Sequence, residues 1–282
     1  MRFNKTIKNK RMKINIVSLS LLFATILLSC QKDNLEIEVK TDVPLIRNVV
    51  IANQPFYEYS YDYNDLISAE KSKFNITKYL YNDKKQLVTT DYYSDNVLLS
   101  NDLQILKNIL ASNVLLSLAD TEKGGTLKYE YNNYGQLIKT IVSRPQNSSP
   151  EYSEYSYDEN DRIGRQTLFW DIKIVGYIDY SYDGRGNLIK ETLYSILSSG
   201  LAELSTTKQY EFDNYQNPFK TFNRLITPGI NTNPNNIIKE TFTIHFKPGQ
   251  GTDIVQITST SYDYNSKGYP IRKNGSVEYF YK

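Results

Sequence analysis

A short tyrosine motif recurs along this chain and constrains its fold more than any other feature. The motif is Tyr, any residue, Tyr or Phe, Asp or Asn, four residues, and then Leu, Ile or Pro. Its six copies begin at Tyr79, Tyr129, Tyr155, Tyr180, Tyr210 and Tyr262. An imperfect copy begins at Tyr59, and a copy cut short by the chain end begins at Tyr279. Such an internal repeat, with a period of about 25 residues, predicts identical structural units that stack on one another.

Each unit of the repeat predicts a β-hairpin. Side chains alternate along a strand, so both rings of Tyr-x-Tyr lie on one face. The Asp or Asn then opens a turn, because its short side chain can bond the backbone ahead of it. Three residues later the copies carry Gly135, Gly186 and Gly268, or instead Lys85, Asp161 and Gln216. Asp or Asn first and Gly fourth is typical of a type I turn that leaves through the left-handed region.

The fold class follows from these hairpins. We expect an all-β chain, a repetitive antiparallel hairpin meander that forms a long twisted or curved sheet. Residues 241–257 are typical of a degenerate unit. Leu103, Leu106 and Leu110 follow Ser100 at helical spacing, which predicts one short inserted helix. One face should carry a ladder of Tyr rings, partly covered by that helix.

The first 29 residues have the layout of an export signal. Six of the 33 basic residues lie there without any acidic residue, and the run from Ile14 to Leu28 is uncharged. The run is too short for a membrane-spanning anchor and ends in polar residues. The remaining chain is net acidic and has no basic block, which excludes a nucleic-acid footprint. We therefore divide the chain into a signal (1–29), a polar tether (30–55) and the repeat domain (56–282).

The end of the signal, Leu27-Leu28-Ser29-Cys30, resembles the lipobox of bacterial lipoproteins. The resemblance implies that the chain is cleaved before Cys30, the only Cys. Cys30 then becomes the new N-terminus and carries the lipid that holds the protein at the membrane. The next residues, Gln31-Lys32-Asp33, resemble the surface-export tag of Bacteroidetes-type lipoproteins. A polar tether is the alternative interpretation of those three residues. The expected location is the outer membrane, at the cell surface.

The repeat itself resembles the RHS or YD repeat, whose core is Tyr-Asp-x-x-Gly-Asn/Arg-Leu. The run from Tyr182 to Leu188 matches this core closely, and the run from Tyr131 to Leu137 nearly does. It is also similar to the tyrosine-rich repeat lipoproteins of Bacteroidetes, in which Asn-Pro-Phe, here Asn217-Pro218-Phe219, is frequent. The resemblance implies a continuous curved sheet over about residues 56–282. The units are too few for a large closed shell.

Candidate chemistry is sparse. One Cys and one His exclude a disulfide, a Cys-rich zinc site and a multi-His metal site. His245 alternates with apolar Ile244 and Phe246, which indicates a strand residue. It could act as a general base only beside a nucleophile and an orienting acid. No phosphate loop or hydrolase motif is present, and we expect no metal and no cofactor. A pair of carboxylates brought together in space stays open.

The tyrosines allow two interpretations. Cross-strand packing is the structural one, because every unit of a repeat needs the same contacts. A binding platform is the functional one, because flat rings with a polar rim stack on sugars and fill interfaces. We assign the repeat pairs to packing. The off-pattern aromatics Tyr134, Tyr215 and Trp170 are the candidate ligand-binding residues.

Three functions are weighed on this basis. The first is a non-enzymatic surface lipoprotein that binds a glycan or an envelope or host protein. The second is a structural or assembly component of the envelope, without a small ligand. The third is a carboxylate-based hydrolase. Exposed coplanar rings would favour the first, a packed Tyr ladder with a bare edge strand the second, and a cleft with two converging acids the third.

Overall fold

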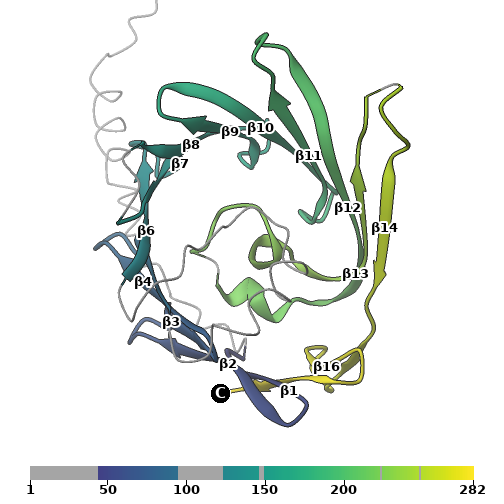
Figure 1. Cartoon of the computed structure of the whole chain (residues 1–282). Helices are drawn as coiled ribbons and strands as arrows, with labels where there is room; N and C mark the ends of the chain where they lie inside the picture. Colours follow the sequence, from purple (N-terminus) through teal and green to yellow (C-terminus); the bar gives the residue numbers. More distant parts are fainter. Residues whose placement is uncertain (1–43, 95–122, 146–148, 223, 248) are drawn as a thin grey trace, which may run out of the picture. The chain divides into compact units, whose positions relative to one another are not determined.

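A computed structural model describes residues 44–94, 123–145, 149–222, 224–247 and 249–282. They belong to the second of two units into which the chain divides, Val43–Lys282. The described residues form one antiparallel sheet of 17 strands, so the all-β prediction is confirmed (Figure 1). The signal, Cys30 and the helix expected over 100–110 lie outside the described residues.

The strands follow one another along the chain with short connections. The first eight are β1 (Ile46–Ile51), β2 (Gln54–Tyr61), β3 (Ile67–Ser72), β4 (Asn75–Tyr81), β5 (Leu87–Ser94), β6 (Lys123–Tyr131), β7 (Leu137–Ser143) and β8 (Glu151–Tyr157). The others are β9 (Ile163–Trp170), β10 (Lys173–Tyr182), β11 (Leu188–Ile196), β12 (Ala202–Gln216), β13 (Asn235–Ile244), β14 (Ile254–Ser259), β15 (Tyr262–Tyr264), β16 (Pro270–Lys273) and β17 (Val277–Tyr281). Two 3₁₀ turns, η2 (Pro218–Thr221) and η3 (Ile230–Thr232), separate β12 from β13.

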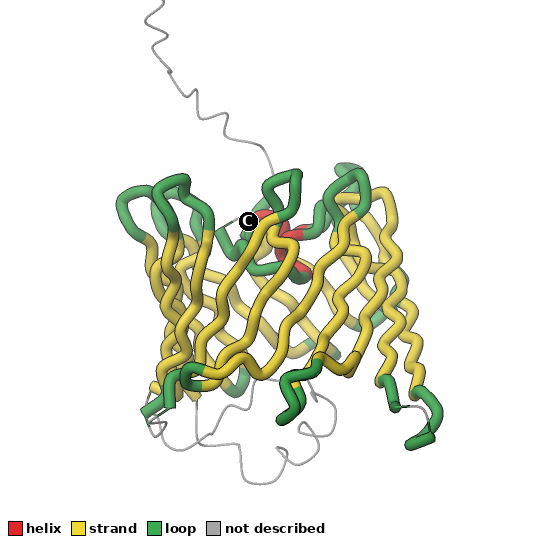
Figure 2. The backbone as a smooth tube through the Cα atoms, turned by 90° about the horizontal axis from the view of Figure 1, so that it is seen from above, coloured by secondary structure: helices red, strands yellow, loops and turns green. Residues whose placement is uncertain are grey.

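The pairing order makes the sheet curve back on itself. Consecutive strands pair from β1 to β14, and β15 pairs with β16 and β16 with β17. The last strand, β17, pairs with the first, β1. The two ends of the open sheet are therefore β14 and β15, which are consecutive in the chain. Figures 1 and 2 show the resulting curved wall of strands.

The turns after the Tyr motif form as predicted. In every unit except the one that begins at Tyr210, the Asp or Asn side chain accepts hydrogen bonds from the backbone N–H groups two and four residues ahead, as Asp183 does from Arg185 and Asn187. The fourth residue has a positive φ, +90° at Gly186. The same holds where the sequence has no glycine: φ is +58° at Lys85 and +60° at Asp161. The side-chain bonds thus impose the turn even on residues that favour it less.

The unit that begins at Tyr210 departs from the predicted hairpin. Gln216 belongs to strand β12 and has no positive φ. Asn217 is buried and its side chain accepts from Phe219 N–H and donates to the carbonyls of Ile230 and Asn233. These bonds draw the chain into an excursion of residues 217–234 before β13 begins. The hairpin expected at Pro218 is corrected accordingly: the Asn-Pro-Phe run redirects the chain.

This excursion covers part of the Tyr-bearing, concave face of the sheet (Figure 1). Its Phe222 is buried with Tyr59 and Ile67, and its Ile226 packs against the cluster of Leu137 and Tyr155. The core of the protein therefore lies between the concave face and this segment. An insertion from the repeat itself thus covers this part of the concave face.

The sheet also begins earlier than the domain boundary at residue 56. Residues 46–55, expected in the tether, form β1 and the start of β2. Ile46 and Val49 are buried there, which ordinary tether residues are not. The degenerate unit over 241–257 is confirmed, because β13 and β14 pair as a hairpin.

Candidate functional site

The repeat tyrosines are occupied by packing and hydrogen bonding. In six units the second Tyr of the motif donates its hydroxyl to a backbone carbonyl of the preceding unit, whereas Tyr264 donates to the Asp213 carboxylate. The bonds run from Tyr61 to Ile46 (2.7 Å), Tyr81 to Ile67 (2.8 Å), Tyr131 to Leu87 (2.8 Å), Tyr157 to Leu137 (3.0 Å), Tyr182 to Ile163 (2.8 Å) and Tyr281 to Pro270 (2.5 Å). Burial raises the pKa of Tyr131 and Tyr155 to about 12, so these phenols stay neutral in alkaline solution as well. The ladder thus favours the structural interpretation of the motif.

The three off-pattern aromatics do not form one site. Tyr134 is 91% exposed in the turn between β6 and β7. Tyr215 stacks on Tyr264 with ring centroids 4.0 Å apart and is half exposed. Trp170, 47% exposed, ends β9. Because the strands alternate in direction, Tyr134 and Tyr215 lie at one end of the sheet and Trp170 at the other.

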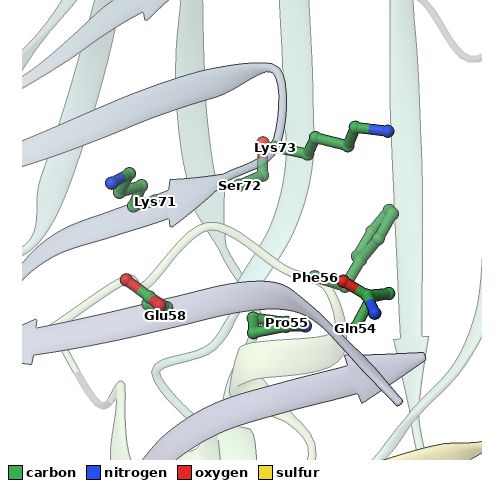
Figure 3. A pocket seen from close by; sticks show the side chains of 7 residues that line it. All are labelled: Gln54, Pro55, Phe56, Glu58, Lys71, Ser72 and Lys73. Carbon is green, nitrogen blue, oxygen red and sulfur yellow. The ribbon is translucent and has the colours of Figure 1, made fainter. Parts of the chain in front are cut away.

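A better candidate is a hollow on the outer side of β2 and β3, which we call the β2–β3 hollow. It has a volume of about 340 Å³. Its lining residues are Gln54, Pro55, Phe56, Glu58, Lys71, Ser72 and Lys73, shown in Figure 3. The volume lies near the lower end of the range of small-molecule sites, ~300–1,000 Å³.

Strand alternation explains how the hollow arises. Tyr57, Tyr59 and Tyr61 face the concave side, so Phe56 and Glu58 face outward. Glu58 lies opposite Lys71 in the ladder between β2 and β3. The register of β1 with β2 shifts between Val49 and Val50, which pair with Tyr57 and Pro55, so Phe56 has no partner in β1. The register, rather than any sequence motif, collects these side chains.

The lining offers both apolar and polar contacts. The Phe56 ring and Pro55 provide an apolar surface, and Gln54 adds an amide that donates and accepts. Within the described ranges, the side chains of Glu58 and Lys71 make no hydrogen bond or ion pair, although the two residues are cross-strand neighbours. Free charges of both signs beside a ring can bind a ligand that has an apolar face and a hydroxyl rim. Off-pattern Phe56 is the sequence signal that could have pointed here.

A half-buried acid lies on the opposite face of the same hairpin. Glu70 pairs with Tyr59 and Thr77, which places it among the concave tyrosines. Burial raises the pKa of its carboxyl to about 7. In the described part of the chain, the carboxyl of Glu70 makes no hydrogen bond or ion pair. The sequence analysis missed this residue, although aligning the two strands of the hairpin would have placed Glu70 opposite Tyr59.

The side chain of His245 has hydrogen-bond partners on both of its ring nitrogens. Its Nε2 lies 2.9 Å from Thr207 Oγ1, and its Nδ1 lies 2.7 Å from Asp253 Oδ2. Hydrogen bonds from Phe246 N–H and His245 lower the pKa of the Asp253 carboxyl. The distances match a nucleophile–base–acid relay, but Thr207 is only 8% exposed and lies outside the β2–β3 hollow. The relay joins β12 to the connection between β13 and β14.

Two further features bear on function. In the part of the chain that the structure describes, no three His, Cys, Asp or Glu residues gather as a metal site would require. Within the same residues, no helix has the length and apolar character needed to cross a bilayer.

Comparisons with known proteins give no family. No protein-family profile matches the sequence, and no curated protein is similar to it. Among solved structures, the chain is similar to the crystal structure of TcdB2-TccC3, with 15% identity and a TM-score of 0.29. That match covers 73% of this chain and 10% of the other, so the chain spans about a tenth of the length of that protein.

Two porin-like proteins of Bacteroides are matched over nearly their whole length. The one from Bacteroides uniformis ATCC 8492 has 12% identity and a TM-score of 0.36, over 79% of this chain and 95% of that one. The one from Bacteroides vulgatus ATCC 8482 has 10% identity and a TM-score of 0.38, over 85% and 99%. With such low identities and scores, no function is carried from these proteins to this chain.

Proposed function

We propose that this protein is a lipid-anchored outer-membrane protein, displayed at the cell surface, that binds a glycan in the β2–β3 hollow without catalysing a reaction. The lipobox-like end of the signal and the Gln-Lys-Asp run support the location. One observation carries the binding role: the Phe56 ring borders a hollow in which Glu58 and Lys71 have no partner.

The chemistry of this lining suits a sugar better than an apolar ligand. A sugar ring can lie on Phe56 with its apolar face, while its hydroxyls donate to Glu58 and accept from Lys71. Two unpaired charges make the hollow unfavourable for a wholly apolar molecule, because they would lose their water without compensation. The repeat tyrosines contribute the rigid wall that holds β2 and β3 in place.

The test is a glycan array probed with the detergent-solubilised full chain, followed by titration of any glycan that binds. Phe56→Ala should weaken binding about tenfold, since the loss of an aromatic contact of ~1.4 kcal/mol is a factor of ten. Glu58→Gln should also weaken the binding of glycans whose hydroxyls donate to that side chain. Phe280→Ala is the matched control, because Phe280 is an exposed aromatic of β17 outside the hollow.

Binding that survives Phe56→Ala and Glu58→Gln unchanged would place the glycan elsewhere and overturn the assignment of the hollow. If no glycan binds, the second candidate gains support: a structural component of the envelope. The packed Tyr ladder favours that candidate. A hydrolase is the third candidate, in which Glu70 would act as the acid. Glycans recovered intact after incubation with the protein would argue against it.

A further inference from the structure

Strand β14 is an uncovered edge of the sheet. Among the described residues it pairs only with β13. Both of its faces are open: Ile254, Val255 and Ile257 are 54%, 56% and 60% exposed. On its other side the sheet would continue with β16, but this strand has only four residues and pairs with β15 instead.

The backbone of β14 presents free hydrogen-bonding groups in a defined pattern. Thr260 N–H donates to the Ile238 carbonyl of β13, so even-numbered residues of this strand bond towards β13. Ser261 bonds the other way: its carbonyl accepts from Asn274 N–H, and its N–H donates to the Asn274 side chain. By the same alternation, the N–H and C=O groups of Val255, Ile257 and Ser259 point away from β13 with no strand beside them.

Soluble proteins usually protect such an edge with charges, prolines or bulges. The stretch from Ile254 to Ser261 has no charged residue and no proline, and the register of β13 with β14 has no bulge. An unprotected apolar edge is a template for another strand.

We propose that the occupant of this edge is β14 of a second copy of the chain, paired antiparallel about a two-fold axis at Gln256. In this register Val255 faces Ile257 of the partner subunit, and Ile257 faces Val255 of the partner subunit. The free groups of these residues then form about four hydrogen bonds, since both belong to the outward-bonding set. The apolar side chains of each pair lie on the same face.

The charges near the edge are compatible with this occupant. The same register places Asp253 of the partner subunit opposite Ser259, which on its other side pairs with Lys239 of β13. Within each copy Lys239 is ion-paired with Glu211, and Asp253 with His245, so neither charge depends on a partner across the edge. Like charges do not meet anywhere along the shared edge, because Ile254–Ser261 carries none. A two-fold contact of this kind is closed and self-complementary.

Cysteine cross-linking of the full chain tests the axis directly. Gln256 would face its own copy in a non-hydrogen-bonded pair, with Cα atoms ~4.5 Å apart, which a disulfide can bridge. Gln256→Cys should therefore give a disulfide-linked dimer under mild oxidation. Thr258→Cys is the matched control: it lies on the same face of the same strand, but its own copy would be about 14 Å away. Cys30 is present in both variants and in the wild type, so any link through it appears equally in all.

A cross-linked dimer from Gln256→Cys and none from Thr258→Cys supports the proposal. No dimer beyond that of the wild type, or equal dimer from both variants, overturns it. Sedimentation of the unoxidised protein gives a second readout: the wild type should have twice the mass of the Ile257→Lys variant, which places a charge on the edge. A monomeric wild type, or a stable complex with an unrelated chain at this edge, would also overturn it. The contact is independent of the β2–β3 hollow, so its failure leaves glycan binding untouched.

Discussion

Replacing Glu70 by Gln should make the protein more stable at neutral and alkaline pH. Glu70 lies among Tyr57, Tyr59, Tyr79 and Tyr92, and burial, followed by the charge of Glu70, raises the pKa of each of these phenols. None of these four groups is cationic, so the folded protein favours the neutral carboxyl. Gln keeps nearly the same shape and cannot ionise.

The sign and size follow from the pKa of Glu70. Its carboxyl titrates at about 7 in the folded protein, against an ordinary value of 4.5. Between these two pH values the folded state holds the proton more tightly, so the free energy of unfolding falls as the pH rises. At 1.36 kcal/mol per pH unit, the loss is at most about 3 kcal/mol. It is complete above pH ~7 and absent below pH ~4.5.

Urea melts of the wild type and Glu70→Gln at several pH values from 4.5 to 8.5 measure this loss. The two proteins should have equal free energies of unfolding near pH 4.5. As the pH rises, the free energy of unfolding of the wild type should fall below that of the variant, by up to ~3 kcal/mol at pH 8. Glu58→Gln, on the outer face of the same hairpin, should follow the wild type throughout. Parallel curves for the wild type and Glu70→Gln would refute the reasoning, because Glu70 would then titrate alike in both states.

The remaining predictions concern the ladder, the turns and the anchor. Tyr182→Ala should cost about 3–5 kcal/mol in urea melts, since it removes a packed ring, whereas Tyr134→Ala should stay within about 0.5 kcal/mol; equal melts would mean that the ladder does not stabilise the sheet. Gly186→Val should cost roughly 1–2 kcal/mol because of its positive φ, and Gly184→Ala, in the same turn with open space around its Cα, should not; a neutral Gly186→Val would contradict the turn geometry. Cys30→Ala should leave the precursor uncleaved or release the protein from membranes, as fractionation would reveal; a variant processed and retained like the wild type would disprove the lipobox interpretation.

Local patterns in the sequence predicted the repeated elements well. Tyr-x-Tyr followed by Asp or Asn identified the strand, its buried face and the turn, because these depend on neighbouring residues. The positive φ at Gly186 was predicted in the same way and is confirmed. The imperfect copies were recognised as hairpins too, since the degenerate unit over 241–257 pairs as expected.

The candidate site was not predictable in this way. Phe56, Glu58 and Lys71 are unremarkable in the sequence, and only the register between β2 and β3 brings them around one hollow. Tyr134 and Trp170 were singled out because they break the repeat. The alternating strand directions place them at opposite ends of the sheet, which a pattern of single residues does not reveal.

The sequence by itself determined the all-β class, the hairpin unit and the Tyr-bearing face, because each follows from contacts within about ten residues. Only the tertiary structure decided how the sheet ends and what covers it. The pairing of β1 with β17 joins residues more than 200 positions apart, and the excursion after Asn217 packs against strands from distant units. The exposed edge at β14 is a consequence of the same long-range pairing: β16 is too short to continue the ladder, and the strand that would complete it is absent from the described residues.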